Sequence, residues 1–174
     1  MRRSSSLVVS IALIASLGAA QAPAHAKRLK TETALTPFVG TWKLVSSEQR
    51  MADGTVRPYG FGPHATGYLM YDATGHVCVQ VVNPDRPRWV DPDHPTPAET
   101  RTSFDGFGGY CGKFTVDTSK HVLTHIPEVS FDPNIVQKPS PRNYSFDGQR
   151  LVYEGTDDSD GPETHWTMVW ERVQ

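Results

Sequence analysis

The sequence predicts an all-β domain whose strands pair antiparallel in the order in which they occur. Three observations support this fold class. Short segments of strand-forming residues recur along the chain, residues typical of tight turns stand between them, and only one segment has the pattern of a helix. Chains that build a parallel sheet alternate strands with long helices, so we expect a β-sandwich or a β-barrel instead.

Nine segments have the length and the residue types of strands. They are Gly40–Gln49, Thr55–Pro58, Thr66–Tyr71, His76–Val82, Cys111–Asp117, His121–Val129, Arg142–Asp147, Arg150–Thr156 and Thr164–Val173. Several joints between them suit tight turns, because Asp53-Gly54 and Asp147-Gly148 each supply a glycine that tolerates positive φ. Asp72–Gly75 and Asp117–Lys120 offer looser turns of the same kind. Sequential antiparallel pairing follows.

Two proline-rich stretches interrupt the strands. Asn83–Pro97 contains five prolines, which cannot donate to a strand ladder, so this stretch is expected to leave the sheet. Pro97–Gly108 then resembles one short helix, with a proline at its start, Glu99 in its first turn and glycines at its end. Long loops often cover binding sites, and we expect residues 83–109 to cap a cavity. Ser130–Pro141 is a second candidate entrance.

The first 26 residues have the pattern of a signal peptide. Arg2 and Arg3 precede a short apolar run, and Ala24-His25-Ala26 is a small-x-small cleavage site, with Ala20-Gln21-Ala22 as an alternative. The apolar run has about 14 residues, against roughly 20 for a membrane-spanning helix, so a membrane anchor is disfavoured. We expect a signal peptide over 1–26, a linker over 27–36, a barrel-sized domain over 37–174, and a periplasmic or secreted location.

The charge of the mature chain argues against two classes of partner. The signal carries two arginines and no acid, which leaves 15 basic and 19 acidic residues and a net charge of −4. An acidic chain is a poor match for nucleic acid or for an anionic membrane surface. We therefore expect no nucleic-acid partner and no membrane insertion after the signal is cleaved.

Two cysteines, Cys78 and Cys111, fall in predicted strands. In an oxidising compartment they could form a disulfide, but this needs the two α-carbons close together, usually about 4.4–6.8 Å apart, and the sequence does not fix the register. Two buried free thiols are the favoured alternative. The chain has no paired C-x-x-C pattern, and no metal site or cofactor is expected.

The motif Gly40-Thr41-Trp42 resembles the start of the first strand of lipocalins, in which the Trp packs across the closed end of the barrel. Phe38–Glu48 and Val169–Val173 are also similar to the first and last strands of intracellular fatty-acid-binding proteins. Asp53-Gly54 makes a turn where those proteins have a helical pair, and their carboxylate-holding Arg-x-Tyr corresponds to Met168 and Trp170 here. Fatty-acid binding in their manner is therefore not expected.

A fuller resemblance, over Phe38–Val173, is to the lipocalin-like domain family of bacterial and fungal proteins. Eight stretches carry it in order: GTWKLVS, ADGTVRPYG, ATGYLMYDATGHVCVQ, NPDRPRW, FDGFGGYCGKFTVD, THIPEVSFDP, RNYSFDGQRL and VWERV. The resemblance implies a single antiparallel up-and-down β-barrel of lipocalin or calycin type, with about eight or nine strands, one short helix and an internal cavity. It implies no catalytic residues and no cofactor.

Barrels of this size hold one small ligand among inward side chains, so candidate ligand-binding residues come from strand interiors. They are Tyr68, Gln80, Tyr110, His125, Arg142 and Trp166. Each has a structural alternative. The tyrosines could pack in the core, and Gln80 could lie on the solvent face of its strand. Arg142 could form a surface ion pair, and Trp166 could plug one end of the barrel.

His125 supports a second hypothesis for function. Its ordinary pKa near 6.5 suits acid–base chemistry inside a barrel. His121 shares its predicted strand face, but the nearest acid, Glu128, is predicted on the opposite face, which disfavours a metal site. The first expectation is an exported protein that binds a small, largely apolar molecule. The alternative is a barrel enzyme, an isomerase, cyclase or hydratase acting on a polyketide- or terpenoid-like substrate, with an interaction role in the envelope as a third possibility.

Overall fold

The computed structural model describes residues 33–158 and 161–174, so the expected signal peptide lies outside the described residues. The described elements are β1 (Gly40–Arg50), β2 (Val56–Pro58), β3 (Thr66–Tyr71), β4 (His76–Val82), α2 (Pro97–Asp105), β5 (Phe107–Asp117), β6 (Val122–Ser130), η1 (Pro133–Ile135), β7 (Ser140–Asp147), β8 (Arg150–Asp157) and β9 (Thr164–Arg172). No helix within these ranges has the length and apolar character to cross a membrane.

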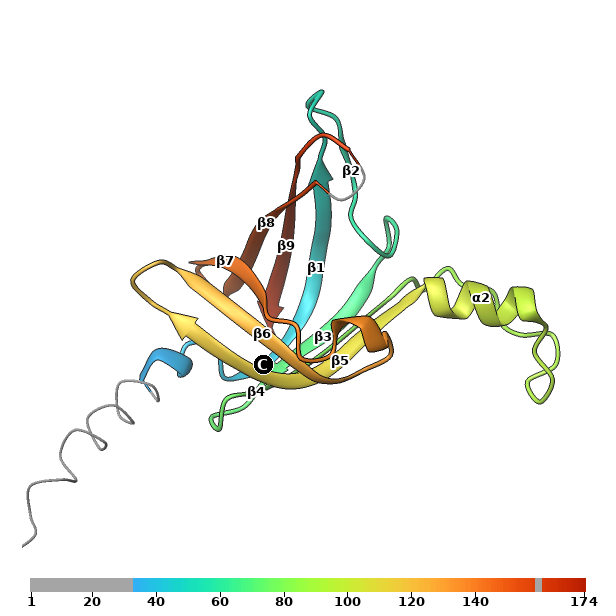
Figure 1. Ribbon diagram of the computed structural model, residues 1–174, viewed down its shortest axis with the longest axis horizontal. Helices are drawn as coiled ribbons and strands as arrows, with labels where there is room; N and C mark the ends of the chain where they lie inside the picture. Colours follow the sequence, from blue (N-terminus) through green and yellow to red (C-terminus); the bar gives the residue numbers. More distant parts are fainter. Residues whose placement is uncertain (1–32, 159–160) are drawn as a thin grey trace, which may run out of the picture.

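The strands form one antiparallel sheet that closes into a barrel (Figure 1). Their order is β2-β1-β3-β4-β5-β6-β7-β8-β9, and β1 also pairs with β9. Eight strands make the closed wall, and β2 adds a short extra strand beside the end of β1, where Glu48–Arg50 faces Val56–Pro58. The predicted up-and-down antiparallel barrel is confirmed, and the described residues contain little helix.

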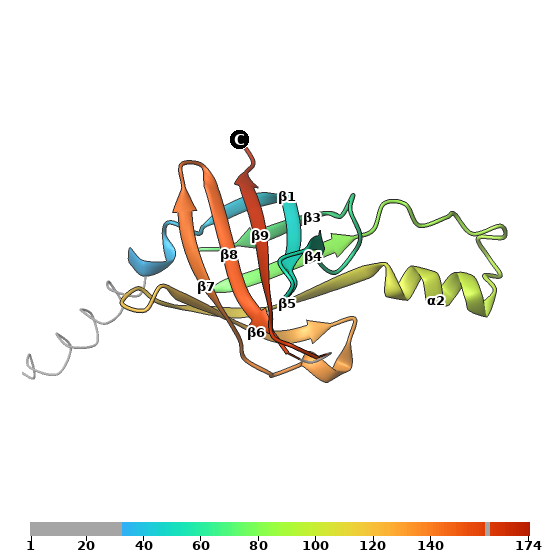
Figure 2. The ribbon, with the colours of Figure 1, turned by 90° about the horizontal axis from the view of Figure 1, so that it is seen from above.

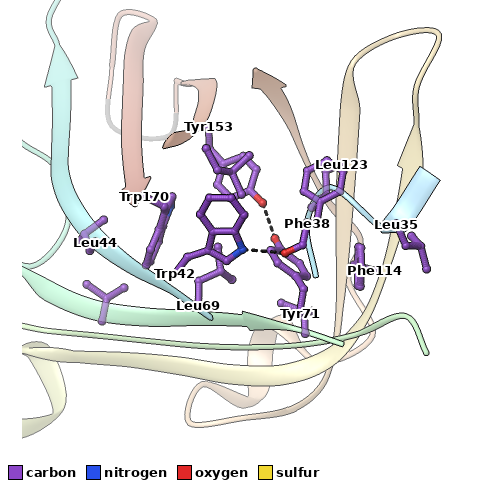
Figure 3. Packing of buried hydrophobic residues seen from close by; sticks show 13 residues of the cluster. Leu35, Phe38, Trp42, Leu44, Leu69, Tyr71, Phe114, Leu123, Tyr153 and Trp170 are labelled. Carbon is purple, nitrogen blue, oxygen red and sulfur yellow. Dashed lines mark hydrogen bonds between the residues drawn. The ribbon is translucent and has the colours of Figure 1, made fainter. Parts of the chain in front are cut away.

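Trp42 packs across the closed end of the barrel, as the resemblance implied (Figure 3). Its side chain is 1% exposed, its indole Nε1–H donates to the carbonyl oxygen of Phe38 at 2.7 Å, and the guanidinium of Arg172 lies 4.1 Å from its ring centroid. Leu35, which the sequence placed in the linker, is also buried there. The core cluster comprises Leu35, Phe38, Trp42, Leu44, Leu69, Tyr71, Val77, Val81, Phe114, Leu123, Leu151, Tyr153 and Trp170.

The excursion between β4 and β5 does not cap the barrel, and the expectation that it would is wrong. The segment projects away from the barrel wall and carries α2 outward (Figure 2). None of the residues of α2 is buried. The helix is nevertheless well defined, because Thr96 and Glu99 form a capping box and Arg101 pairs with Asp105 at 2.7 Å. Local polar contacts, not core packing, hold the projecting arm.

A different loop covers the open end of the barrel. Tyr59 stacks on Trp166 with their ring centroids 5.7 Å apart, and Trp166 lies so close to Gly155 that any Cβ there would overlap its ring. Phe61 packs in the same way against Gly108. Gly60 has φ +77°, a conformation that favours glycine and lets the short loop present both aromatic rings.

Cys78 and Cys111 form a disulfide, so the favoured expectation of free thiols is wrong. The two residues are direct cross-strand partners in β4 and β5, with α-carbons 4.1 Å apart. The sequence could not fix this register. Because the bond joins the strands on either side of the projecting arm, it closes a loop with a sequence separation of 33 residues.

Removing this disulfide should lower the free energy of unfolding by about 2–4 kcal/mol, since the bond restricts the unfolded chain. We expect Cys78→Ala/Cys111→Ala to show this loss in urea denaturation, and the wild type in strong reductant to show the same loss. A double variant as stable as the oxidised wild type would contradict the pairing.

Candidate functional site

The inward side chains divide the barrel interior into two halves. Next to the closed end most of them are fully buried, as Leu69, Phe114 and Trp170 illustrate, although Phe146 at the rim is 40% exposed. Towards the end where β1, β4, β6 and β8 finish, several inward side chains keep partial exposure to solvent. These are Val79, Tyr110, Arg142, Trp166 and Met168. Partial exposure of inward residues marks the open half of the barrel as accessible from outside.

His125 is the centre of a polar network between the two halves. Its side chain is 0% exposed, and both ring nitrogens contact tyrosine hydroxyls. Nε2 lies 2.5 Å from the hydroxyl of Tyr71, and Nδ1 lies 2.6 Å from the hydroxyl of Tyr110. The hydroxyl of Tyr71 also meets that of Tyr153 at 2.5 Å (Figure 3). Four side chains from β3, β5, β6 and β8 are thus joined across the barrel.

A neutral imidazole donates one hydrogen bond and accepts one, so the chain of contacts has a direction. If Tyr110 donates to Nδ1, then Nε2–H donates to Tyr71, Tyr71 donates to Tyr153, and the hydroxyl hydrogen of Tyr153 is left at the end. In the opposite direction, the hydroxyl hydrogen of Tyr110 is left over. Either arrangement ends in an O–H group that needs an acceptor outside the chain of contacts.

Burial keeps this network uncharged. Burial, followed by the nearby charge of Arg142, holds the pKa of His125 well below its ordinary value. Burial also raises the pKa of Tyr71 and that of Tyr153 above the ordinary tyrosine value. At neutral pH the imidazole is therefore neutral and both phenols keep their protons.

Arg142 is the charged group beside the network. Its Nη2 atom donates to the hydroxyl and carbonyl oxygens of Ser140, at 2.9 and 3.2 Å, and lies 3.5 Å from the hydroxyl of Tyr110. The guanidinium carbon is 5.6 Å from the ring centroid of Tyr153. Burial opposes the charge of Arg142, but the tyrosines around it outweigh this effect and its pKa lies above the ordinary value.

The Nε atom of Arg142 is buried and has no hydrogen-bond partner. A buried donor of this kind is uncommon, because leaving it unsatisfied costs about 1–3 kcal/mol or more when the group is charged. The indole Nε1 of Trp170, a neutral group, is also buried without a partner. The interior therefore offers donors that lack acceptors.

Three of the six predicted site residues come together here: Tyr110, His125 and Arg142. Trp166 lies at the open end under Tyr59, where it has the plugging position that the sequence left as an alternative. Sequence reasoning missed Tyr71 and Tyr153. In β8, Leu151 and Tyr153 alternate with the polar Arg150 and Glu154, which was the signal that could have placed Tyr153 inside; β3 offers no such signal for Tyr71.

Tyr68 and Gln80 are placed differently from the expectation. They are direct cross-strand partners, and both point to the outer face of the barrel, where Tyr68 is 49% exposed. The inward residues of β4 are Val77, Val79 and Val81 instead. In β3 both alternating sets are hydrophobic, so the pattern alone did not identify the buried face.

The shared strand face expected for His121 and His125 is also corrected. His121 precedes β6, has φ +54°, and lies in the turn with its ring 5.7 Å from that of Tyr144. It is exposed, whereas His125 is buried. Across residues 33–158 and 161–174, no group of three or more His, Cys, Asp or Glu side chains is arranged to hold a metal ion.

A hollow lies on the outside of the barrel, over β1, β8 and β9. It has a volume of about 610 Å³. Most of its lining consists of outward polar side chains, including Glu48, Arg50, Glu154, Thr156 and His165. It is separate from the His125 network and has the character of a solvated groove.

Comparison with known proteins gives one strong match. A family model described as a lipocalin-like domain covers residues 39–173. Among solved structures, EF1p2_mFAP2b bound to DFHBI has 13% identity and a TM-score of 0.40 over 82% of this chain and 99% of its own. The siderocalin Ex-FABP, described as functioning through dual ligand specificities, has 9% identity and a TM-score of 0.30 over 78% and 73%. Both likenesses are too distant to carry an argument. The curated proteins include no match.

Acid should destabilise the fold through His125. The unfolded chain takes up a proton on this imidazole below about pH 6.5, while the lowered pKa prevents the folded chain from doing so. This contribution to stability is therefore complete above about pH 6.5 and falls by up to about 1.4 kcal/mol per pH unit below it.

Urea denaturation of the wild type and His125→Gln at about pH 8 and pH 5.5 tests this. The stability difference between them should shrink by about 1.4 kcal/mol on acidification. His165→Gln removes an exposed imidazole and should follow the wild type. A difference between wild type and His125→Gln that does not change with pH would show that His125 is not held neutral.

Proposed function

The chain belongs to the lipocalin-like domain family, and we propose that it binds a small, largely apolar molecule in the open half of its barrel. One observation carries the proposal. Most inward side chains next to the closed end are buried, whereas five inward side chains towards the open end, Val79, Tyr110, Arg142, Trp166 and Met168, keep partial exposure. A barrel of about eight strands has room for one small ligand among its inward side chains, and these five residues mark the part of the interior that solvent reaches.

The chemistry of the open half matches the proposed ligand. Val79, Met168 and Trp166 give it an apolar lining, and Tyr110 and Arg142 supply a few polar groups. Ligand pockets in proteins usually combine a mostly apolar wall with a small number of placed polar groups that orient the ligand. Tyr59 and Phe61, from the short loop at the open end, would contact a ligand as it enters.

Acid–base catalysis is the second candidate function, an isomerisation, cyclisation or hydration of a polyketide- or terpenoid-like substrate. The contact of 2.6 Å between His125 Nδ1 and the Tyr110 hydroxyl favours it. His125 itself is fully buried, so the hydroxyl of Tyr110 would face the substrate and His125 would relay its proton. The binding proposal needs only the accessible interior, and we place it first.

We also propose that the protein is exported. The signal-like residues 1–26 support this, and so does the Cys78–Cys111 disulfide, because disulfides persist in oxidising compartments. Expression of the full chain in a Gram-negative host tests the proposal. N-terminal sequencing of periplasmic protein should find Lys27 as the first residue, and full-length protein kept in the cytosol would contradict export.

Phenylnaphthylamine (NPN), a neutral apolar dye that fluoresces when it leaves water, tests ligand binding directly. The wild type should bind it saturably with one site. Val79→Trp, which fills the interior, should weaken binding about tenfold or more, whereas Gln80→Trp, the adjacent outward residue, should leave Kd within about twofold. Equal effects of the two variants, or no saturable binding to folded wild type, would contradict the proposal.

A further inference from the structure

We propose that Arg142, together with Tyr110, binds an anionic group on the ligand, so that the ligand is a small organic anion with an apolar body. This inference rests on the proposed binding function and specifies its ligand. The observation behind it is a guanidinium inside the barrel wall whose Nε–H has no acceptor. A carboxylate, sulfonate or phenolate oxygen would supply that acceptor.

Arg142 lacks a counter-charge within the described chain. The ion pairs among the described residues are His64–Asp85, His76–Asp72, His94–Asp91, Arg101–Asp105, Lys113–Glu128 and Lys120–Asp117, and none involves Arg142. Arg142 keeps partial exposure, but its Nε–H is buried, and a charged donor shielded from water is costly unless it is paired. A ligand anion would complete the pairing.

Other arginines of the chain are satisfied by the protein itself. Arg172 donates to the carbonyl oxygens of Val39 and Pro37 at 2.6 and 2.7 Å and covers the Trp42 ring. Arg86 donates to the carbonyl oxygens of Asn83 and Ser103, both at 3.0 Å. These arginines complete the packing of a barrel end and of the projecting arm. Arg142 differs from them, because its Nε–H donates to no group of the protein.

The surroundings of Arg142 hold its guanidinium in place for a ligand. Ser140 accepts hydrogen bonds from Nη2, and the ring of Tyr153 lies beside the guanidinium. Tyr110 is fixed by His125 and brings its hydroxyl within 3.5 Å of Nη2. When Tyr110 is the end of the hydrogen-bond chain, its O–H is a second donor for the same anion. Such charge-assisted contacts are stronger than neutral ones.

The apolar part of the ligand follows from the same placement. Arg142 lies in the open half, where Val79, Met168 and Trp166 form the apolar wall. An inorganic anion would leave that wall uncovered, and a neutral hydrocarbon would leave the guanidinium unpaired. An organic anion with an aromatic or aliphatic body satisfies both.

Two dyes with the same skeleton test the inference: anilinonaphthalene sulfonate (ANS), which carries a sulfonate, and NPN, which lacks it. Both are titrated against folded wild type, Arg142→Met and Arg150→Met. Arg150 lies on the outer face of β8, so its variant makes the same change in net charge away from the interior. We expect wild type to bind ANS more tightly than NPN. Arg142→Met should weaken ANS about tenfold or more and change NPN less than about twofold.

The outcomes separate the two proposals. If folded wild type binds neither dye, the proposed binding function fails. If it binds NPN, but Arg142→Met leaves ANS affinity unchanged or Arg150→Met weakens it equally, the anion inference fails and the binding function stands. If Arg142→Met does not fold, Arg142→Lys replaces it, since Lys keeps the charge but lacks the Nε–H fork. Weaker ANS binding with unchanged NPN binding then supports the inference, and unchanged ANS binding overturns it.

Discussion

The arrangement of polar side chains inside this barrel depends on the hydrogen bonds that a fully buried imidazole must make. His125 is neutral because burial opposes its charge, and a neutral imidazole has one donor and one acceptor. Tyr71 and Tyr110 meet both nitrogens, and Tyr71 passes the chain on to Tyr153. Any one of these groups left alone inside an apolar core would cost stability, so the strands that carry them must keep their relative positions.

This network also separates two kinds of packing. Below it, around Trp42 and Phe38, aromatic rings close the barrel, and the side chains of Trp42 and Phe38 are nearly inaccessible. Above it, several inward side chains are partly accessible, and the charged group, Arg142, keeps a donor without a partner. The closed half holds large buried rings of the core cluster. The open half has the features expected where a protein gives up some stability to bind a ligand.

Much of the fold could be predicted because its signals are local. Turn residues such as Asp147-Gly148 and the alternation within each strand located the strands to within a few residues. Features set by long-range contacts were harder. The Cys78–Cys111 bond depends on a register between two strands separated by a long excursion, and nothing in the arm's own sequence shows that it projects outward.

The site was predicted in part for the same reason. In β3, Leu69 and Tyr71 alternate with Met70 and Tyr68, so both faces are hydrophobic, and the sequence did not reveal that Tyr68 faces outward. Polar residues in otherwise apolar strands were the useful signal. His125 lies between Leu123 and Pro127 on the inward face of β6, and such a residue needs partners from other strands. Those partners, Tyr71 and Tyr153, were hidden among ordinary core aromatics.

The most direct test of this account is the side-chain N–H resonance of Arg142 Nε, followed by ¹⁵N NMR while ANS is added to the folded protein. If the unpaired Nε–H is the ligand's anchor, its resonance should shift downfield and exchange more slowly with water as the dye saturates the barrel. An Arg142 Nε–H resonance that stays unchanged while ANS binds would contradict the account.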